Sequence, residues 1–289
     1  MYDPELVRVR APLTTALALA RAGHEADARA VCHLARERCE TSPCGLEALD
    51  ALPAGDLDGA LQATLAERFG MAFGAPDAAP SGLSAALAAA AAGGAEAQVR
   101  LIDDLVAHLA KSPGDSEAHL WLALGYRCQW LIESGYRATW RRLGLPPVDM
   151  AEAAVAANHD ATPEKLACMF EHLVRALSPR REDLGRNLHI HQALAGWLRD
   201  IDHGADAELH YRIVLRALTI NGEAHKALGE ILLAKGAAGE AVVHLEAALE
   251  QLGDPVAQRR IHGQLGLARR LSGEPLRAME HFFQAVTGR

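Results

Sequence analysis

The chain has 289 residues, half of them hydrophobic, which is enough apolar side chain to build a large core and excludes a disordered protein. Aromatic residues make up only 4% of the chain while alanine and leucine are abundant, a composition that favours helices and argues against an all-β fold. The formal net charge of −8 and the presence of only four lysines disfavour binding to nucleic acid or to an anionic membrane.

The N-terminal region, residues 1–70, contains a short apolar run at residues 11–20 that follows Arg8 and Arg10. Secretory signal peptides share that pattern, but acidic residues precede these arginines and threonines interrupt the run. Small residues then follow at a spacing that recurs near the C-terminus, so we expect a helical hairpin over about residues 9–42 and no secretion signal. These small residues are Gly23, Ala28, Cys32 and Ala35.

Residues 71–82 are rich in proline, glycine and alanine, a composition typical of a linker or long loop, and we place a domain boundary there. The next region, residues 83–187, is predicted to be helical. One helix contains Trp121 and follows a proline-glycine turn. Another helix, at residues 166–177, follows Thr162 and Pro163, which are favourable residues for a helix start.

The C-terminal region, residues 188–289, contains an internal repeat. One copy has its marker residues at Leu228, Gly229, Gly236, Ala241, Leu245 and Ala248. The next copy keeps the same spacings 37 residues later, at Leu265, Gly266, Gly273, Ala278, Phe282 and Ala285. A third copy lies 34 residues before the first, at Leu194, Ala207, Tyr211 and Val214. Because small residues let two antiparallel helices approach closely, and a glycine supplies the turn, each copy predicts a helix-turn-helix.

This pattern resembles the repeat of the tetratricopeptide-repeat (TPR) family, in which W-x2-L-G-x2-Y is followed by a turn glycine and then by A-x3-F-x2-A. His191, His225 and His262 take the tryptophan place, whereas Trp121 retains the family's tryptophan and is expected in the core. The resemblance implies an all-α fold, an α-solenoid in which antiparallel helix hairpins stack into a superhelix. Three repeats would fill residues 188–289, and the repeats of the N-terminal half would be degenerate.

Histidines and cysteines are the candidates for metal binding and catalysis. His189 and His191 lie two residues apart, which separates them by about 200° around a helix, so they cannot bind one ion without other ligands. The segment Asp200–His203 offers oxygen and nitrogen ligands for a metal ion. The same residues are equally expected in a solvated turn that ends a helix. Cys32 and Cys168 occupy core positions of their helices. Because no phosphate-binding, dinucleotide-binding or hydrolase motif occurs, we predict no catalytic residue, cofactor or metal site.

The resemblance also implies a binding groove, because the first helices of TPR hairpins line the concave face of the superhelix. Four positions of each first helix point into that groove, and basic residues among them suit a partner segment that carries carboxylates. The alternative is that these are ordinary solvated side chains. The groove residues assigned in this way are His119, Tyr126, Gln129, His189, Gln192, Arg199, Glu223, Lys226, Glu230, Arg260 and Arg270.

The sequence therefore predicts a non-enzymatic adaptor or assembly scaffold that binds a peptide or helix of another protein, and neither nucleic acid nor a membrane. The alternative is a helical enzyme or enzyme subunit, with residues 44–187 as the active or cofactor-binding region and the repeats as a targeting arm. No run approaches the roughly 18 apolar residues of a membrane span. The five cysteines form no CxxC pair, which favours a reducing cytoplasm.

The C-terminal hairpin is predicted to leave apolar surface uncovered. The sequence ends directly after the second helix of the last repeat, without the extra helix that commonly caps such arrays. We expect Phe282 to pack inward. The residues expected to remain exposed are Leu267, Leu271, Phe283 and Val286. A second copy in a homo-oligomer, a partner protein or an earlier part of the chain is expected to cover them.

Overall fold

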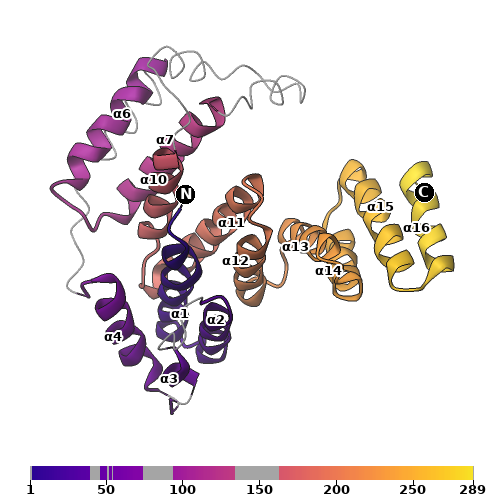
Figure 1. Ribbon diagram of the computed structural model, residues 1–289, viewed down its shortest axis with the longest axis horizontal. Coiled ribbons are helices and arrows are strands. Elements are labelled where there is room, and N and C mark those ends of the chain that lie inside the picture. Colours follow the sequence, from indigo (N-terminus) through magenta and orange to yellow (C-terminus); the bar gives the residue numbers. More distant parts are fainter. Residues whose placement is uncertain are drawn as a thin grey trace.

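The computed structural model describes residues 2–39, 46–50, 52–53, 55–73, 94–133 and 163–288. Every regular element in these ranges is helical, which confirms the predicted all-α class (Figure 1). No helix of the described part of the chain combines the length and the apolar character needed to span a membrane. Most of the predicted linker, residues 74–82, lies outside the described residues.

The described ranges contain the following helices in chain order. The π-helical turn η1 (Leu6–Arg10) runs directly into α1 (Ala11–Arg21), followed by α2 (Glu25–Glu37), the short α3 (Glu47–Asp50), α4 (Leu57–Phe69), α6 (Gly94–Leu109), α7 (Ser116–Glu133) and α10 (Pro163–Arg175). After the 3-10 turn η2 (Arg181–Asp183) come α11 (Leu184–Asp200), α12 (Gly204–Ala217), α13 (Gly222–Ala234), α14 (Ala238–Gln251), α15 (Pro255–Leu271) and α16 (Pro275–Thr287).

Consecutive helices pack as pairs: α1 with α2, α11 with α12, α13 with α14, and α15 with α16. The helices α7 and α10 form a further pair. In Figure 1 the three C-terminal pairs follow one another to the C-terminus, while α1 and α2 lie beside α11 and α12. The second helix of one pair contacts the first helix of the next, α12 on α13 and α14 on α15. In the N-terminal region, α1 and α2 form a helical hairpin.

Helix starts and turns follow from local chemistry. Asn221 and Asp254 cap α13 and α15 by accepting hydrogen bonds from backbone amides three residues later, at 3.0 and 2.8 Å. Gly23, Gly236 and Gly273 form turns of three hairpins with φ of 84°, 81° and 81°, in the left-handed region that glycine tolerates.

The corresponding turn between α11 and α12 contains Asp202, which lies 34 residues before Gly236. Its φ is 62°, and among the described residues it is the only non-glycine residue with a positive φ. An L-residue with a Cβ atom pays a conformational cost in that region. The chain therefore forms the same turn at this hairpin, although Asp202 is less favourable there than glycine.

Small residues permit the close helix approach that the repeat predicts. A Cβ atom on Gly229 would lie 2.7 Å from the Leu245 side chain, and a Cβ atom on Gly266 would lie 2.6 Å from the ring of Phe282. Ala241 is fully buried as well. Both glycines are thus needed for the second helix of the hairpin to pack directly on the first.

The prediction that Trp121 is a core residue is wrong. Trp121 is 39% exposed, whereas His119, two residues earlier, is 5% exposed and contacts His172 of α10. Residues two apart on a helix point about 200° apart, so only one of them can face the partner helix. The register of α7 is therefore shifted by two residues from the one that the tryptophan motif indicated.

Two large cores hold the N-terminal and C-terminal parts together. The first core runs from α10 to α15 and includes Tyr2 and Val7 from the beginning of the chain. The second core joins α1, α2 and α4 to Leu209 and Ile213 of α12. A smaller cluster lies between α6 and α7. The N-terminal hairpin therefore completes the core around α12, across about 200 residues of sequence.

Candidate functional site

A row of polar side chains links the first helices of the three C-terminal hairpins. Arg199 of α11 lies 3.5 Å from a carboxylate oxygen of Glu230 on α13. Gln264 of α15 donates a hydrogen bond from Nε2 to the other oxygen of Glu230, at 2.7 Å. These contacts connect α11, α13 and α15 one after another. We call the three residues the polar row.

Other predicted groove residues lie near the polar row or on the same helices. Asn221 donates a hydrogen bond to Oε1 of Gln192 at 3.2 Å, and Lys226 pairs with Glu223 at 2.5 Å. The exposed members of the predicted set are His189, Arg199, Glu223, Arg260 and Arg270. The partly buried members are Tyr126, Gln192, Lys226 and Glu230. His119 is buried, and the side chain of Gln129 lies outside the described part of the chain.

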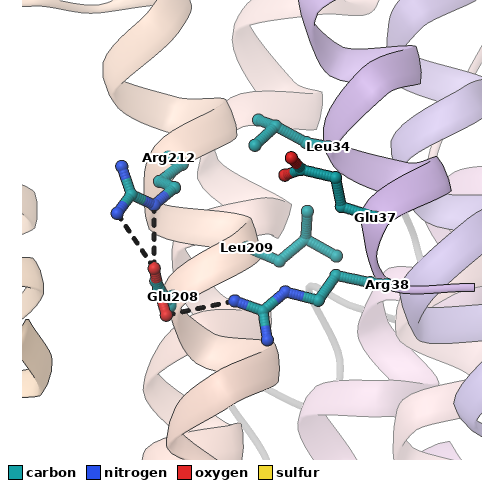
Figure 2. Close-up of a pocket in the computed structure, with 6 residues that line it drawn as sticks. All are labelled: Leu34, Glu37, Arg38, Glu208, Leu209 and Arg212. Carbon is teal, nitrogen blue, oxygen red and sulfur yellow. Dashed lines mark hydrogen bonds and ion pairs between the residues drawn. The ribbon is translucent and has the colours of Figure 1, made fainter. Parts of the chain in front are cut away.

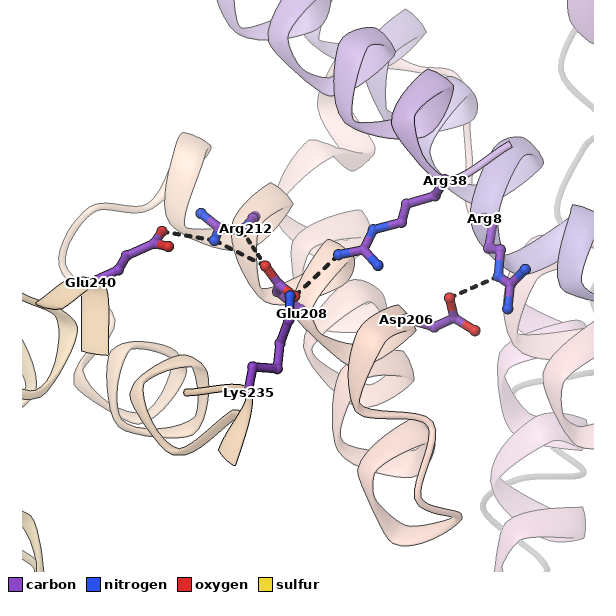
Figure 3. A network of polar contacts seen from close by, with 7 residues as sticks. All are labelled: Arg8, Arg38, Asp206, Glu208, Arg212, Lys235 and Glu240. Carbon is purple, nitrogen blue, oxygen red and sulfur yellow. Dashed lines mark hydrogen bonds and ion pairs between the residues drawn. The ribbon is translucent and has the colours of Figure 1, made fainter. Parts of the chain in front are cut away.

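A second polar group centres on Glu208, whose side chain is only 4% exposed (Figure 3). Its carboxylate accepts hydrogen bonds from Arg38 of α2 at 3.1 Å, from Arg212 of α12 at 2.9 Å and from Lys235 at 2.5 Å. Arg212 also pairs with Glu240 at 2.7 Å. Burial alone would raise the pKa of Glu208, but the hydrogen bonds from Lys235 and Arg212 outweigh it and lower the pKa.

A small cavity of about 180 Å³ lies beside Glu208, between α2 and α12 (Figure 2). Its lining residues are Leu34, Glu37, Arg38, Glu208, Leu209 and Arg212. Pockets for small molecules typically measure about 300–1,000 Å³. Because this cavity is smaller and both of its arginines already pair with Glu208, its geometry fits a structural joint between hairpins better than a ligand site.

The turn around Asp200–His203, weighed as a metal site, is engaged in protein contacts. Asp200 pairs with Arg127, and Nδ1 of His203 lies 3.2 Å from the Tyr2 hydroxyl. The Tyr2 hydroxyl donates to the buried Asp206, and burial is the main cause that raises the pKa of Tyr2. Within the described ranges no three potential metal ligands come together.

Histidines pair across four of the helix pairs, a feature that our sequence reasoning missed. In each case an Nδ1 atom on one helix lies within hydrogen-bond distance of an Nδ1 atom on the other. The pairs are His119–His172 at 2.8 Å, His191–His210 at 2.8 Å, His225–His244 at 2.9 Å and His262–His281 at 3.1 Å. We call them the histidine pairs.

The histidine pairs follow the repeat. In three of them the two histidines lie 19 residues apart, and in the His119–His172 pair they lie 53 apart, which is 34 more and equals one repeat. The signal that could have revealed them is a histidine recurring 19 residues after each histidine in the tryptophan place. A single histidine at that place carries no such information, which is why the first-helix residues alone did not predict the pairs.

The backbone fixes the protons of two histidine pairs. Nε2 of His119 and Nε2 of His225 lie 3.0 and 3.1 Å from carbonyl oxygens, so each must donate a proton there. Their Nδ1 atoms are then acceptors, and the second-helix rings of His172 and His244 donate from Nδ1. When both rings of such a pair are neutral, they therefore carry complementary tautomers.

The His191–His210 pair lies deepest in the protein and extends to a third helix. Nε2 of His191 lies 2.7 Å from Oγ1 of Thr15 on α1, while Nε2 of His210 is buried without a hydrogen-bond partner. Burial lowers the pKa of His210 to about 3. Burial, followed by repulsion from His210, lowers the pKa of His191 well below its ordinary value. Both rings are therefore neutral at pH 7.

We compared the sequence with protein-family models and with curated proteins. No model of a protein family matches the chain, and no curated protein resembles it significantly in sequence.

Proposed function

We propose that the protein is a non-enzymatic adaptor, a TPR-like α-solenoid that binds a segment of another protein along the first helices of its C-terminal hairpins. The observation that carries this proposal is the polar row Arg199–Glu230–Gln264, which crosses α11, α13 and α15. An extended or helical peptide that lies across three hairpins would meet this continuous line of donors and acceptors.

The polar row can exchange its partners. The Arg199–Glu230 distance of 3.5 Å is long for an ion pair, and the two side chains are 39% and 24% exposed. Such a pair contributes about 1 kcal/mol or less, so a carboxylate from a partner can replace Glu230 at small cost. Because a guanidinium binds a carboxylate through two parallel hydrogen bonds, Arg199 favours a partner segment with acidic side chains.

The experiment that tests the proposal is binding of the full chain to an array of acidic peptides. We expect the Arg199→Glu/Lys226→Glu double variant to lose about tenfold or more in affinity, because it removes two cationic contacts and introduces repulsion. The matched control is Lys111→Glu/Arg181→Glu, which makes the same charge change at exposed positions away from the row. Equal loss in both double variants, or no peptide binding by the wild type, would contradict the proposal.

The alternative of an enzyme centred on residues 44–187 stays a prediction, because much of that range lies outside the described residues. The cavity next to Glu208 does not bear on this alternative, because all of its lining residues lie outside residues 44–187. The adaptor is therefore the function that the geometry supports best.

A further inference from the structure

The last helix presents a long apolar stripe to solvent. Leu276, Met279, Phe283 and Val286 of α16 are 78%, 68%, 65% and 84% exposed. Their spacings of three, four and three residues place them on one side of the helix. We call these four residues the α16 face. An exposed contiguous patch of this kind is unusual on a monomer and marks an interaction surface.

The repeat identifies this side as the stacking side of a hairpin. Met279 and Phe283 of α16 correspond to Val242 and Glu246 of α14, 37 residues earlier. Val242 is 6% exposed, and Glu246 pairs with Arg269 of α15, the next hairpin. The same side of α14 therefore faces the following hairpin, with Val242 buried and the Glu246 side chain 45% exposed.

One hairpin further back, the corresponding residues are Glu208 and Arg212 of α12, which pair with Lys235 and Glu240 of the following hairpin. The chemistry of this side thus changes along the chain, from charged residues in α12 to large apolar residues in α16. Ion pairs suit a fixed neighbour within the same chain. Bulky apolar residues need a neighbour that also offers an apolar surface.

Two properties of the α16 face make it complementary to the same face on a second copy of the chain: the spacing of its residues and its exposed area. The order of its spacings, three, four and three, reads identically in both directions. A two-fold axis between antiparallel copies of α16 therefore sets Leu276 opposite Val286 and Met279 opposite Phe283, so that every apolar residue meets an apolar residue. Together with the adjacent Phe282, which is 37% exposed, the face offers roughly 600 Å², at the lower end of the ~600–1,000 Å² that each partner buries in a specific interface.

We propose that two copies of this chain associate through the α16 face, with the two α16 helices antiparallel about a two-fold axis. This dimer goes beyond the adaptor function, since it depends on α16 and not on the polar row. Two linked grooves would also bind a partner with two acceptor segments more tightly than one groove does.

The first test is the mass of the full chain in sedimentation velocity runs from about 1 to about 100 µM, a range that brackets a micromolar Kd. We expect the wild type to form a dimer and Phe283→Glu to remain a monomer over the whole range, because the substitution buries a carboxylate opposite Met279. The matched control is Val243→Glu, which changes a residue that is 63% exposed on α14 and lies outside the face. It should dimerise like the wild type.

A wild-type chain that stays monomeric over this range would overturn the proposal, as would a dimer that Phe283→Glu leaves intact. Both variants should keep the circular dichroism spectrum of the wild type, because the substituted side chains are exposed in the single chain. If Phe283→Glu changes the spectrum, the same runs with Met279→Glu decide the question.

The second test addresses the geometry. A photo-reactive p-benzoylphenylalanine in place of Phe283 should crosslink to Met279 of the second copy, detected by mass spectrometry on a mixture of isotopically light and heavy chains. Crosslinks only within one chain, or between α16 and a different surface of the second copy, would contradict the antiparallel arrangement.

Discussion

Lowering the pH should unfold this protein through its histidine pairs. Burial is the first cause that lowers the pKa of both His210, to about 3, and His172, to about 4. In the unfolded chain both side chains have a pKa of about 6.5. Between these values the unfolded chain binds more protons than the folded chain, so the free energy of unfolding decreases as the pH falls from 6.5 towards 3.

The magnitude follows from the buried His210. Each pH unit below 6.5 costs about 1.4 kcal/mol for a histidine that stays neutral when folded, so at pH 5 His210 alone costs about 2 kcal/mol. His172 contributes less, because it is only partly buried and solvent screens it. A loss of this size is a large part of a typical stability of about 5–15 kcal/mol.

The charged groups around the pairs do not reverse this direction. Around His172, Glu171 raises the pKa of the ring, whereas Arg175 and a charge on His119 lower it. His191 and His210 face each other and Thr15, and His191 is fully buried. Among the residues that the structure describes, no carboxylate stabilises a proton on either ring of the deepest pair.

Urea unfolding at pH 7.5, 6.5, 5.5 and 5.0 measures the effect, and His191→Leu/His210→Leu isolates the deepest pair. We expect the free energy of unfolding of the double variant to fall less than that of the wild type between pH 6.5 and 5, by about 2 kcal/mol or more. His189→Leu removes an exposed histidine of the same helix and serves as the control. If the double variant and the wild type lose stability equally, the histidine pairs do not carry the acid sensitivity.

Three further predictions concern stability and are measured by chemical denaturation. Asp202→Gly should stabilise the protein by about 1 kcal/mol, because glycine tolerates the left-handed turn; a destabilisation would contradict this reading. Gly266→Ala should cost about 1–3 kcal/mol through its clash with the neighbouring ring, whereas Gly263→Ala, which has room for a Cβ atom, should cost nothing. Glu208→Gln should cost about 1.5–3 kcal/mol because it leaves three cations without their carboxylate, against less than 1 kcal/mol for the more exposed Glu240→Gln; equal losses would refute a special role of the buried carboxylate.

Local rules made part of the fold predictable. Gly23 and Gly236 indicated turns because only glycine enters the left-handed region without cost, and Gly229 indicated a close helix approach because it lacks a Cβ atom. The register of α7 was not predictable from Trp121, because a single motif residue does not decide which side of a helix faces its partner.

The candidate site was less predictable from the sequence than the fold, because many of its contacts join residues far apart in the chain. Arg199 and Glu230 came from the repeat register, and the structure brings them together. The buried contacts of Asp206 with Tyr2 and Arg8 span about 200 residues, and no local pattern signals them. The same holds for Arg38 on Glu208, because it depends on how the N-terminal hairpin docks on α12.

The most direct measurement of the central claim is hydrogen exchange of the full chain with and without the tightest acidic peptide from the array. Binding along the polar row predicts slower exchange in α11, α13 and α15, the first helices that carry Arg199, Glu230 and Gln264, and little change in α12 and α14. Protection confined to α12 and α14, or to the α16 face, would contradict a groove on the first helices.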